Sequence, residues 1–242
     1  MSIYKLVFEE NFNVEKELNP KIWNYQVGEK WSNNESQCYV SDSKHCYISD
    51  SKLHIVATYE KGEHCPYKSA RLNTFGKYHF QYGRFVINAK MPKGRGAWPA
   101  LWFLGTSKKE KLPWPLCGEI DLLEYAGNRS SQVTCAIHTQ TYNHKINTHK
   151  GATTPLLDAS DSFHDYSLEW TKTHLLFFVD DIEVMRVEKK INDTEKEWPF
   201  DKPYYFILNL AVGGWYGGEI VEEDLPYHLE ISSIKYYELN EK

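Results

Sequence analysis

The chain has 242 residues, of which 41% are hydrophobic, 25% charged and 15% aromatic, and its formal net charge is −5. These proportions are those of an ordinary globular protein with enough chain for a sizeable core, and an all-β protein of this size is routinely one domain, here 1–242. The negative charge provides no basic surface for nucleic acid or an anionic membrane, and no apolar run approaches the length of a membrane span, so we expect neither partner.

The first eight residues lack the charged segment and apolar stretch of a secretion signal, so we expect no signal peptide. The location of the protein stays open: it is either cytoplasmic or a secreted protein whose signal has been removed from this sequence. The cysteines are five in number and contain no CxxC pair: Cys38, Cys46, Cys65, Cys117 and Cys135. We predict buried free thiols rather than a disulfide framework or a zinc cluster, which favours a reducing compartment.

Short segments with alternating apolar residues recur along the chain and predict half-buried antiparallel strands. The shared faces are Leu53, Ile55, Ala57 and Tyr59, then Phe85, Ile87 and Ala89, then Tyr166, Leu168 and Trp170. Runs 175–179 and 204–208 are continuously apolar and predict buried strands, and turn residues such as Asp180-Asp181 and Gly213-Gly214 separate the segments. No long stretch has a helical apolar stripe, so the pattern favours two packed antiparallel sheets, a β-sandwich.

One predicted strand, Gly118 to Tyr125, carries three acids: Glu119, Asp121 and Glu124. In a regular strand Glu119 and Asp121 share a face, whereas Glu124 falls on the opposite one. A β-bulge at the two leucines before Glu124 restores the phase and places all three carboxylates on one face. Their carboxyl groups then lie within about 5 to 7 Å, which overlaps the separation at which one carboxylate attacks an anomeric carbon and another protonates the leaving oxygen.

Crowded acids raise each other's proton affinity, so a protonated Glu124 beside an ionised Glu119 is the expected resting state, with Asp121 as a hydrogen-bonding helper. Taken alone, the motif could also be a solvated strand edge. Trp98, Trp102 and Trp114 lie just upstream and supply flat rings of the kind on which sugars stack, although core packing explains a single tryptophan equally well.

The sequence closely resembles glycoside hydrolase family 16, in particular its laminarinase-like branch. The matching segments are Phe8-Glu9-Glu10-Asn11-Phe12, Asn34-Glu35-Ser36-Gln37, Ser69-Ala70-Arg71-Leu72-Asn73-Thr74, Tyr82-Gly83-Arg84-Phe85, Trp98-Pro99-Ala100-Leu101-Trp102, Trp114-Pro115-Leu116-Cys117-Gly118-Glu119-Ile120-Asp121, Phe163-His164-Asp165-Tyr166 and Leu208-Asn209-Leu210-Ala211-Val212-Gly213-Gly214. They run nearly from end to end, and the longer ExDxxE form is typical of β-1,3-glucanases and several galactanases.

The resemblance implies a β-jelly-roll sandwich with a concave glycan cleft and retaining endo-hydrolysis of β-1,3-glucan or mixed β-1,3-1,4-glucan. Glu119 would be the nucleophile, Asp121 its helper and Glu124 the acid/base. Asn34 and Arg71 would hydrogen-bond sugars on the non-reducing side, Trp98, Trp102 and Trp114 would line the subsites, and His138 would lie near Glu124. A surface ion pair remains an alternative for Arg71, as does core packing for His138.

Two departures from the family pattern restrict what it implies. Many members end on an Asp-Tyr-Val-Arg-Val-Tyr strand whose aspartate helps to bind structural calcium, but here the run is Ser232-Ser233-Ile234-Lys235-Tyr236-Tyr237. We therefore predict no cofactor and no bound calcium, despite Glu9 and Glu10. Trp215-Tyr216 replaces the usual Asn-Trp, so chain-length preference does not carry over.

His138, His144 and His149 fit no usual metal-ligand spacing, so no metal site is predicted. A non-catalytic lectin on the same sandwich is the main alternative, although intact Glu119, Asp121 and Glu124 weigh against it because three unpaired carboxylates cost stability. A transglycosylase would share the chemistry and is a third reading. We expect a monomer that acts on a β-glucan polysaccharide or oligosaccharide.

Overall fold

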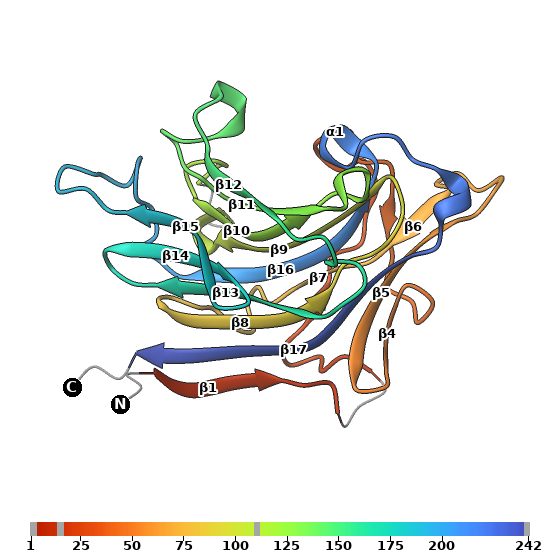
Figure 1. The fold of residues 1–242 in the computed structure, drawn as a ribbon, viewed down its shortest axis with the longest axis horizontal. Coiled ribbons are helices and arrows are strands. Elements are labelled where there is room, and N and C mark those ends of the chain that lie inside the picture. Colours follow the sequence, from red (N-terminus) through yellow and green to blue (C-terminus); the bar gives the residue numbers. More distant parts are fainter. Residues whose placement is uncertain (1–3, 14–16, 109–111, 240–242) are drawn as a thin grey trace.

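The computed structural model describes residues 4–13, 17–108 and 112–239, and these fold into two stacked β-sheets (Figure 1). The first sheet contains β1 (Tyr4–Glu10), β3 (Cys38–Tyr39), β4 (Cys46–Ser49), β5 (Lys52–Tyr59), β6 (Tyr67–Ser69), β8 (Gly83–Lys90), β13 (His164–Trp170), β14 (His174–Val179), β15 (Ile182–Glu188) and β17 (Tyr227–Leu239). The second contains β2 (Asn24–Tyr25), β7 (Arg71–Asn73), β9 (Ala97–Gly105), β10 (Glu119–Tyr125), β11 (Gln132–His138), β12 (Lys150–Pro155) and β16 (Tyr204–Val212).

The first sheet has the order β15-β14-β13-β8-β17-β5-β6-β3, with β1 beside β17 and β4 beside β5; the second has the order β12-β11-β10-β9-β16-β7-β2. Pairing is antiparallel except between β3 and β6. The described helical segments are short: η1 (Thr106–Lys108), η2 (Gly127–Arg129), η3 (His144–Ile146), α1 (Gly214–Gly217) and η4 (Glu222–Asp224). This arrangement confirms the predicted all-β jelly-roll sandwich.

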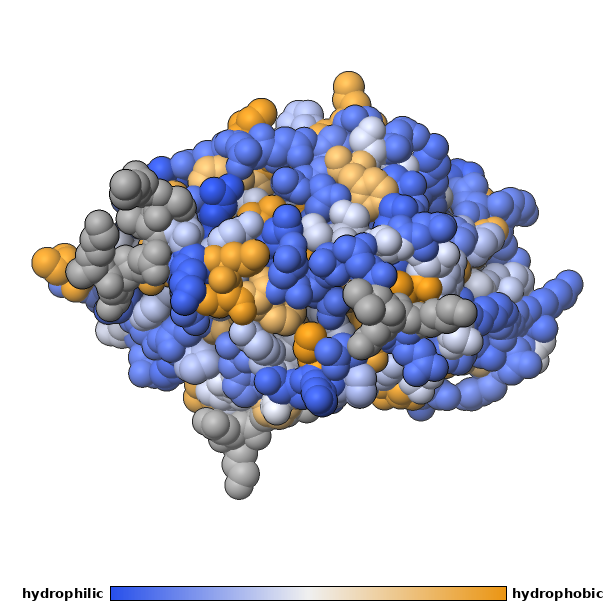
Figure 2. Space-filling view, turned by 90° about the horizontal axis from the view of Figure 1, so that it is seen from below, coloured by the Kyte–Doolittle hydropathy of each residue, from blue (hydrophilic) through white to orange (hydrophobic). Residues whose placement is uncertain are grey.

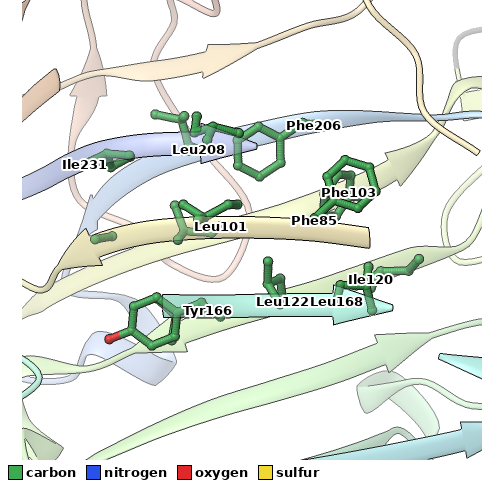
Figure 3. Packing of buried hydrophobic residues seen from close by; sticks show 14 of the residues in the cluster. Phe85, Leu101, Phe103, Ile120, Leu122, Tyr166, Leu168, Phe206, Leu208 and Ile231 are labelled. Atoms are coloured by element: carbon green, nitrogen blue, oxygen red, sulfur yellow. The ribbon is translucent and has the colours of Figure 1, made fainter. Parts of the chain in front are cut away.

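The core lies between the two sheets, as Figure 3 shows for side chains from β8, β9, β10, β13, β16 and β17. β8 alternates buried and partly buried residues along its length, and the predicted inward face of Phe85, Ile87 and Ala89 is confirmed. The core faces predicted on β5 and β13 are also confirmed, with Tyr59 only partly buried. β16 is buried continuously because side chains cover both of its faces: one face lies in the core, and Tyr205 and Ile207 on the other pack in a second hydrophobic cluster with Leu104 and Cys117.

Successive side chains of β9 point to opposite faces of the sheet, and this alternation positions the cavity-lining residues. Ala97, Leu101 and Phe103 point into the core, whereas Trp98 and Trp102 face the opposite side of the sheet. The same strand therefore stabilises the sandwich with one face and lines a cavity with the other.

The face below β1 and β17 is largely covered by hydrophilic residues, with hydrophobic residues visible in separate patches (Figure 2). Within the described part of the chain, no helix has the length and apolar character needed to cross a membrane.

The prediction of free cysteines is wrong for two residues, because Cys38 and Cys65 form a disulfide with a Cα–Cα distance of 6.1 Å. The parallel pairing of β3 with β6 places Cys38 opposite Lys68 and so brings the segment before β6 within reach, a long-range contact that Cys spacing alone does not reveal. Cys46, Cys117 and Cys135 are free and buried, as predicted. A disulfide removes the argument for a reducing compartment.

Replacing both Cys38 and Cys65 by serine should lower the free energy of unfolding by about 3 kcal/mol, because the bond closes a loop with a sequence separation of 27 residues. Denaturant unfolding measures this difference. Dithiothreitol should destabilise the wild-type protein and leave the double variant unchanged; equal stability of the two oxidised proteins would contradict the structural role.

Candidate active site

The acidic strand β10 contains the expected bulge. Its pairing with β9 shifts register between Asp121 and Leu123, and its pairing with β11 shifts between Asp121 and Glu124. Leu122 and Leu123 are consequently both buried in the core cluster. The three acids all line the cavity on the other face.

Neighbouring strands supply polar partners to the acids. Trp98 on β9 donates its indole N–H to Glu124 Oε1 at 3.1 Å. His138 on β11 is paired in register with Glu119, and its Nε2 lies 3.2 Å from Asp121 Oδ2 and 3.9 Å from Glu119 Oε1. His138 Nδ1 is buried without a hydrogen-bond partner.

Burial raises the pKa of all three carboxyl groups. The pKa of Glu119 is raised well above its usual range, first by burial and then by Asp121, and His138 opposes the shift. Burial raises the pKa of Asp121 to about 8. Burial and the Asp121 carboxylate raise the pKa of Glu124 to about 8, against the effect of the Trp98 hydrogen bond. Glu124 therefore carries a proton near neutral pH, as an acid catalyst requires, whereas the raised pKa of Glu119 runs against the expected ionised resting state of that residue.

The cavity over the seven-stranded sheet has a volume of about 440 Å³. It runs across the strands, from the segment around Trp31 and Arg71 on β7, over β16, β9 and β10, to η3. Its lining residues are Trp31, Ser32, Asn33, Glu35, Arg71, Trp98, Ala100, Trp102, Leu104, Lys108, Pro113, Trp114, Glu119, Asp121, Glu124, His144, Lys145, Asn209 and Ala211. Aromatic rings with interspersed polar groups suit a sugar chain, which has apolar faces and hydroxyl edges.

Comparison with known proteins shows the family. The model of glycosyl hydrolases family 16 matches residues 26–230. The chain belongs to glycosyl hydrolase family 16.

Relatives within family 16 resemble the chain over nearly its whole length. A β-glucanase from Rhodothermus marinus is 36% identical, covering 97% of this chain and 85% of the relative. The crystal structure of a laminarinase from Flavobacterium sp. UMI-01 has a TM-score of 0.89 and 40% identity, covering 97% of this chain and 100% of the other. The crystal structure of SCLam, a non-specific endo-β-1,3(4)-glucanase, has a TM-score of 0.93 and 34% identity, covering 99% of this chain and 92% of the other.

Arg71 lies between two of the rings that line the family 16 cleft. Its guanidinium carbon is 5.1 Å from the centroid of Trp31 and 4.9 Å from that of Trp102, and its Nε donates to Gln26 Oε1 at 3.0 Å. Trp102 in turn donates its indole N–H to Asn209 Oδ1 at 2.8 Å. These contacts fix a polar and aromatic surface at the β7 end of the cavity.

The structure places two of the predicted residues differently from the sequence expectation. Asn34 is exposed in a turn and does not line the cavity, whereas its neighbours Asn33 and Glu35 do. His138 is expected near Glu124, but its close carboxylate contacts are with Asp121 and Glu119, because Glu119 is paired directly opposite His138 on β11 whereas Glu124 is paired opposite Thr134, four residues away along that strand.

Sequence reasoning missed several residues of the cleft. Burial raises the pKa of Glu35, which accepts a hydrogen bond from Gln37 Nε2 at 2.9 Å. The Asn33-Asn34-Glu35 run is adjacent to a predicted site residue and could have indicated it. His144 and Lys145 lie in a loop without a recognisable pattern, so no sequence signal identified them.

No cofactor is indicated by membership of family 16, whose catalytic chemistry is carried by side chains. Among the described residues, one group could offer three ligand atoms to a metal ion: those of Glu119, Asp121 and His138 lie within 4.8 Å of one another. This group consists of two of the predicted catalytic acids and their histidine partner. Glu9 and Glu10 belong to no such group in the described chain, and Lys235 Nζ lies 3.7 Å from Glu9 Oε1. The absence of bound calcium stays a prediction from the sequence.

Proposed function

We propose that this protein hydrolyses internal β-1,3 bonds of laminarin-type glucan, and of mixed β-1,3-1,4-glucan, with retention of anomeric configuration. The observation that carries the proposal is the bulge in β10, which places Glu119, Asp121 and Glu124 together in an open cleft. Relatives named as a β-glucanase, a laminarinase and an endo-β-1,3(4)-glucanase support the same substrate class.

In the proposed reaction Glu119 attacks the anomeric carbon while Glu124 protonates the departing glycosidic oxygen. The covalent glycosyl-enzyme is then hydrolysed by a water molecule that Glu124 deprotonates, so Glu124 regains its proton. The raised pKa of Glu124, about 8, supports its role as the acid. Glu119 must be ionised to attack, and His138 favours this form because its Nε2 lies within 4 Å of both carboxylates and opposes the rise in the pKa of Glu119. A charged Asp121 adds to that rise, so Asp121 is proposed to help as a protonated hydrogen-bond donor.

The cleft residues divide between the two sides of the scissile bond. Arg71 and Trp102 are proposed to hold the non-reducing side, with Asn33 and Glu35 beyond them. Asn34 stays a predicted contact in the exposed turn. Trp98 contacts Glu124 directly and is proposed to form a wall beside the reacting sugar.

A lectin or a transglycosylase on the same fold is the second candidate. The raised pKa values of the acids argue against a lectin. Carboxylates that are costly to ionise cluster at catalytic sites, and sugar binding alone does not require them. A transglycosylase uses the same covalent intermediate and differs only in its acceptor.

A reducing-sugar assay against laminarin, mixed-linkage β-glucan, agarose and carboxymethyl cellulose tests the proposal. Release of reducing ends from laminarin is expected, with agarose and carboxymethyl cellulose inert. Binding to glucan without turnover of any substrate would support the lectin, and turnover of agarose alone would move the proposal to a galactan.

A further inference from the structure

The loop between β11 and β12, residues 139–149, is held in shape by its own hydrogen bonds. The Asn143 side chain accepts from Lys145 N at 3.1 Å and donates to the carbonyl oxygens of Thr139 and Gln140, each at 3.1 Å. Thr148 donates its hydroxyl to the carbonyl of Thr141 at 2.8 Å. Asn143 is buried, so η3 is presented to the cleft by an ordered base.

The ring of His144, at the start of η3, lies near two tryptophans: Trp114, which lines the cavity, and Trp215, which is exposed beside it. Its ring centroid lies 4.9 Å from that of Trp114, which precedes β10, and 5.8 Å from that of Trp215 in α1. Below it, the His138 ring is 5.0 Å away in an edge-on arrangement. Figure 1 shows this loop and α1 rising from the same side of the seven-stranded sheet.

The cavity is lined by different sets of residues on the two sides of β10. Toward β7 it is lined by residues of several elements, whereas on the side of η3 its lining includes His144 and Lys145 and the ring of Trp114, which both of them contact. Lys145 Nζ also lies 4.9 Å from the Trp114 centroid, so Trp114 is already contacted by two side chains of this loop. A sugar on this side therefore meets His144 before it can stack on Trp114.

We propose that His144 forms the subsite for the first sugar of the leaving group and orients it toward Glu124. This inference rests on the proposed function, in which the non-reducing sugars lie toward Arg71. The His144 ring lines the cavity and is contacted by the rings of Trp114, Trp215 and His138, and in its neutral form it offers one donor and one acceptor to sugar hydroxyls. Contacts with Trp114, Trp215 and His138 restrict the ring, which lowers the cost of ordering it on binding.

The test compares two substrates with different leaving groups, a sugar in one and fluoride in the other. A β-1,3-linked glucotetraose places a sugar in the leaving-group subsite, whereas β-laminaribiosyl fluoride releases fluoride and leaves that subsite empty. His144→Ala should lower kcat/KM for the tetraose on the order of 10- to 100-fold, within the range expected for one specificity contact. Its kcat/KM for the fluoride should stay within about twofold of wild type, since the acids and the Arg71 side are intact.

His149→Ala is the matched control. His149 also packs against His138, with ring centroids 5.8 Å apart, but it does not line the cavity. It should behave as wild type on both substrates. His144→Gln, which keeps a hydrogen-bonding group, should recover part of the tetraose activity and serves if the alanine variant does not fold.

An equal loss of activity on both substrates would overturn the proposal, because it would show that His144 acts on the catalytic cluster through His138. Unchanged activity on both would overturn it too. Failure of the proposed function is a separate outcome, recognised by a wild-type protein that turns over neither substrate.

Discussion

Glu119→Ala should lower the turnover of laminarin by roughly four orders of magnitude or more, while the protein stays folded and still binds the glucan. The side chain faces the cleft and is 14% exposed, so its removal opens no void in the core. Loss of a carboxyl whose pKa is raised by burial also removes a destabilising group. Reducing-sugar release measures activity, and a thermal melt with glucan-binding measurements provides the control.

Azide identifies the role of Glu119 by the anomer that it forms. If Glu119 is the nucleophile, azide entering its vacated place attacks the β-linked sugar from the opposite face and yields an α-glycosyl azide. A β-glycosyl azide from this variant would mean that Glu119 is the acid/base instead. Nuclear magnetic resonance of the anomeric proton distinguishes the two products.

Glu124→Ala should reduce laminarin turnover on the order of 10² to 10⁴-fold, because the glycosidic oxygen would leave without a proton. Substrates whose leaving group needs no proton, such as dinitrophenyl β-glycosides, should form the covalent intermediate at a rate close to wild type. Azide should then intercept that intermediate and give a β-glycosyl azide. An α-azide would reverse the assignment of the two glutamates.

The pH profile gives an independent check on Glu124. The acid must carry its proton, so wild-type kcat/KM on laminarin should fall as pH rises through the pKa of Glu124, about 8. In Glu124→Ala, assayed with azide and the dinitrophenyl glycoside, that alkaline decrease should be absent. Its persistence would assign it to another group of the cluster, such as Asp121.

Sequence patterns predicted the sandwich because burial on one sheet face imposes a two-residue period. Phe85, Ile87 and Ala89 face the core as that period requires. The same reasoning located the bulge, since Leu122 and Leu123 interrupt the period between acids that share a function. Local patterns thus sufficed wherever the structural cause was itself local.

Features produced by distant pairing could not be predicted. The Cys38–Cys65 bond depends on β3 lying parallel to β6, and nothing near either cysteine encodes that register. His144 reaches Trp114 and Trp215 because loops from three parts of the chain meet above one sheet. His144, Trp114 and Trp215 can all be noticed in the sequence, but only the fold shows that they lie together beside the acids.

The acidic strand also has a thermodynamic consequence for the whole molecule. Asp121 and Glu124 have usual pKa values of 3.8 and 4.5 but values of about 8 in the folded protein. Between those limits the folded state binds more protons than the unfolded state, so stability falls as pH rises across this window. Near neutral pH, Asp121 and Glu124 therefore take up protons from the solvent as the chain folds. The proton that Glu124 is proposed to donate to the glycosidic oxygen is thus bound during folding.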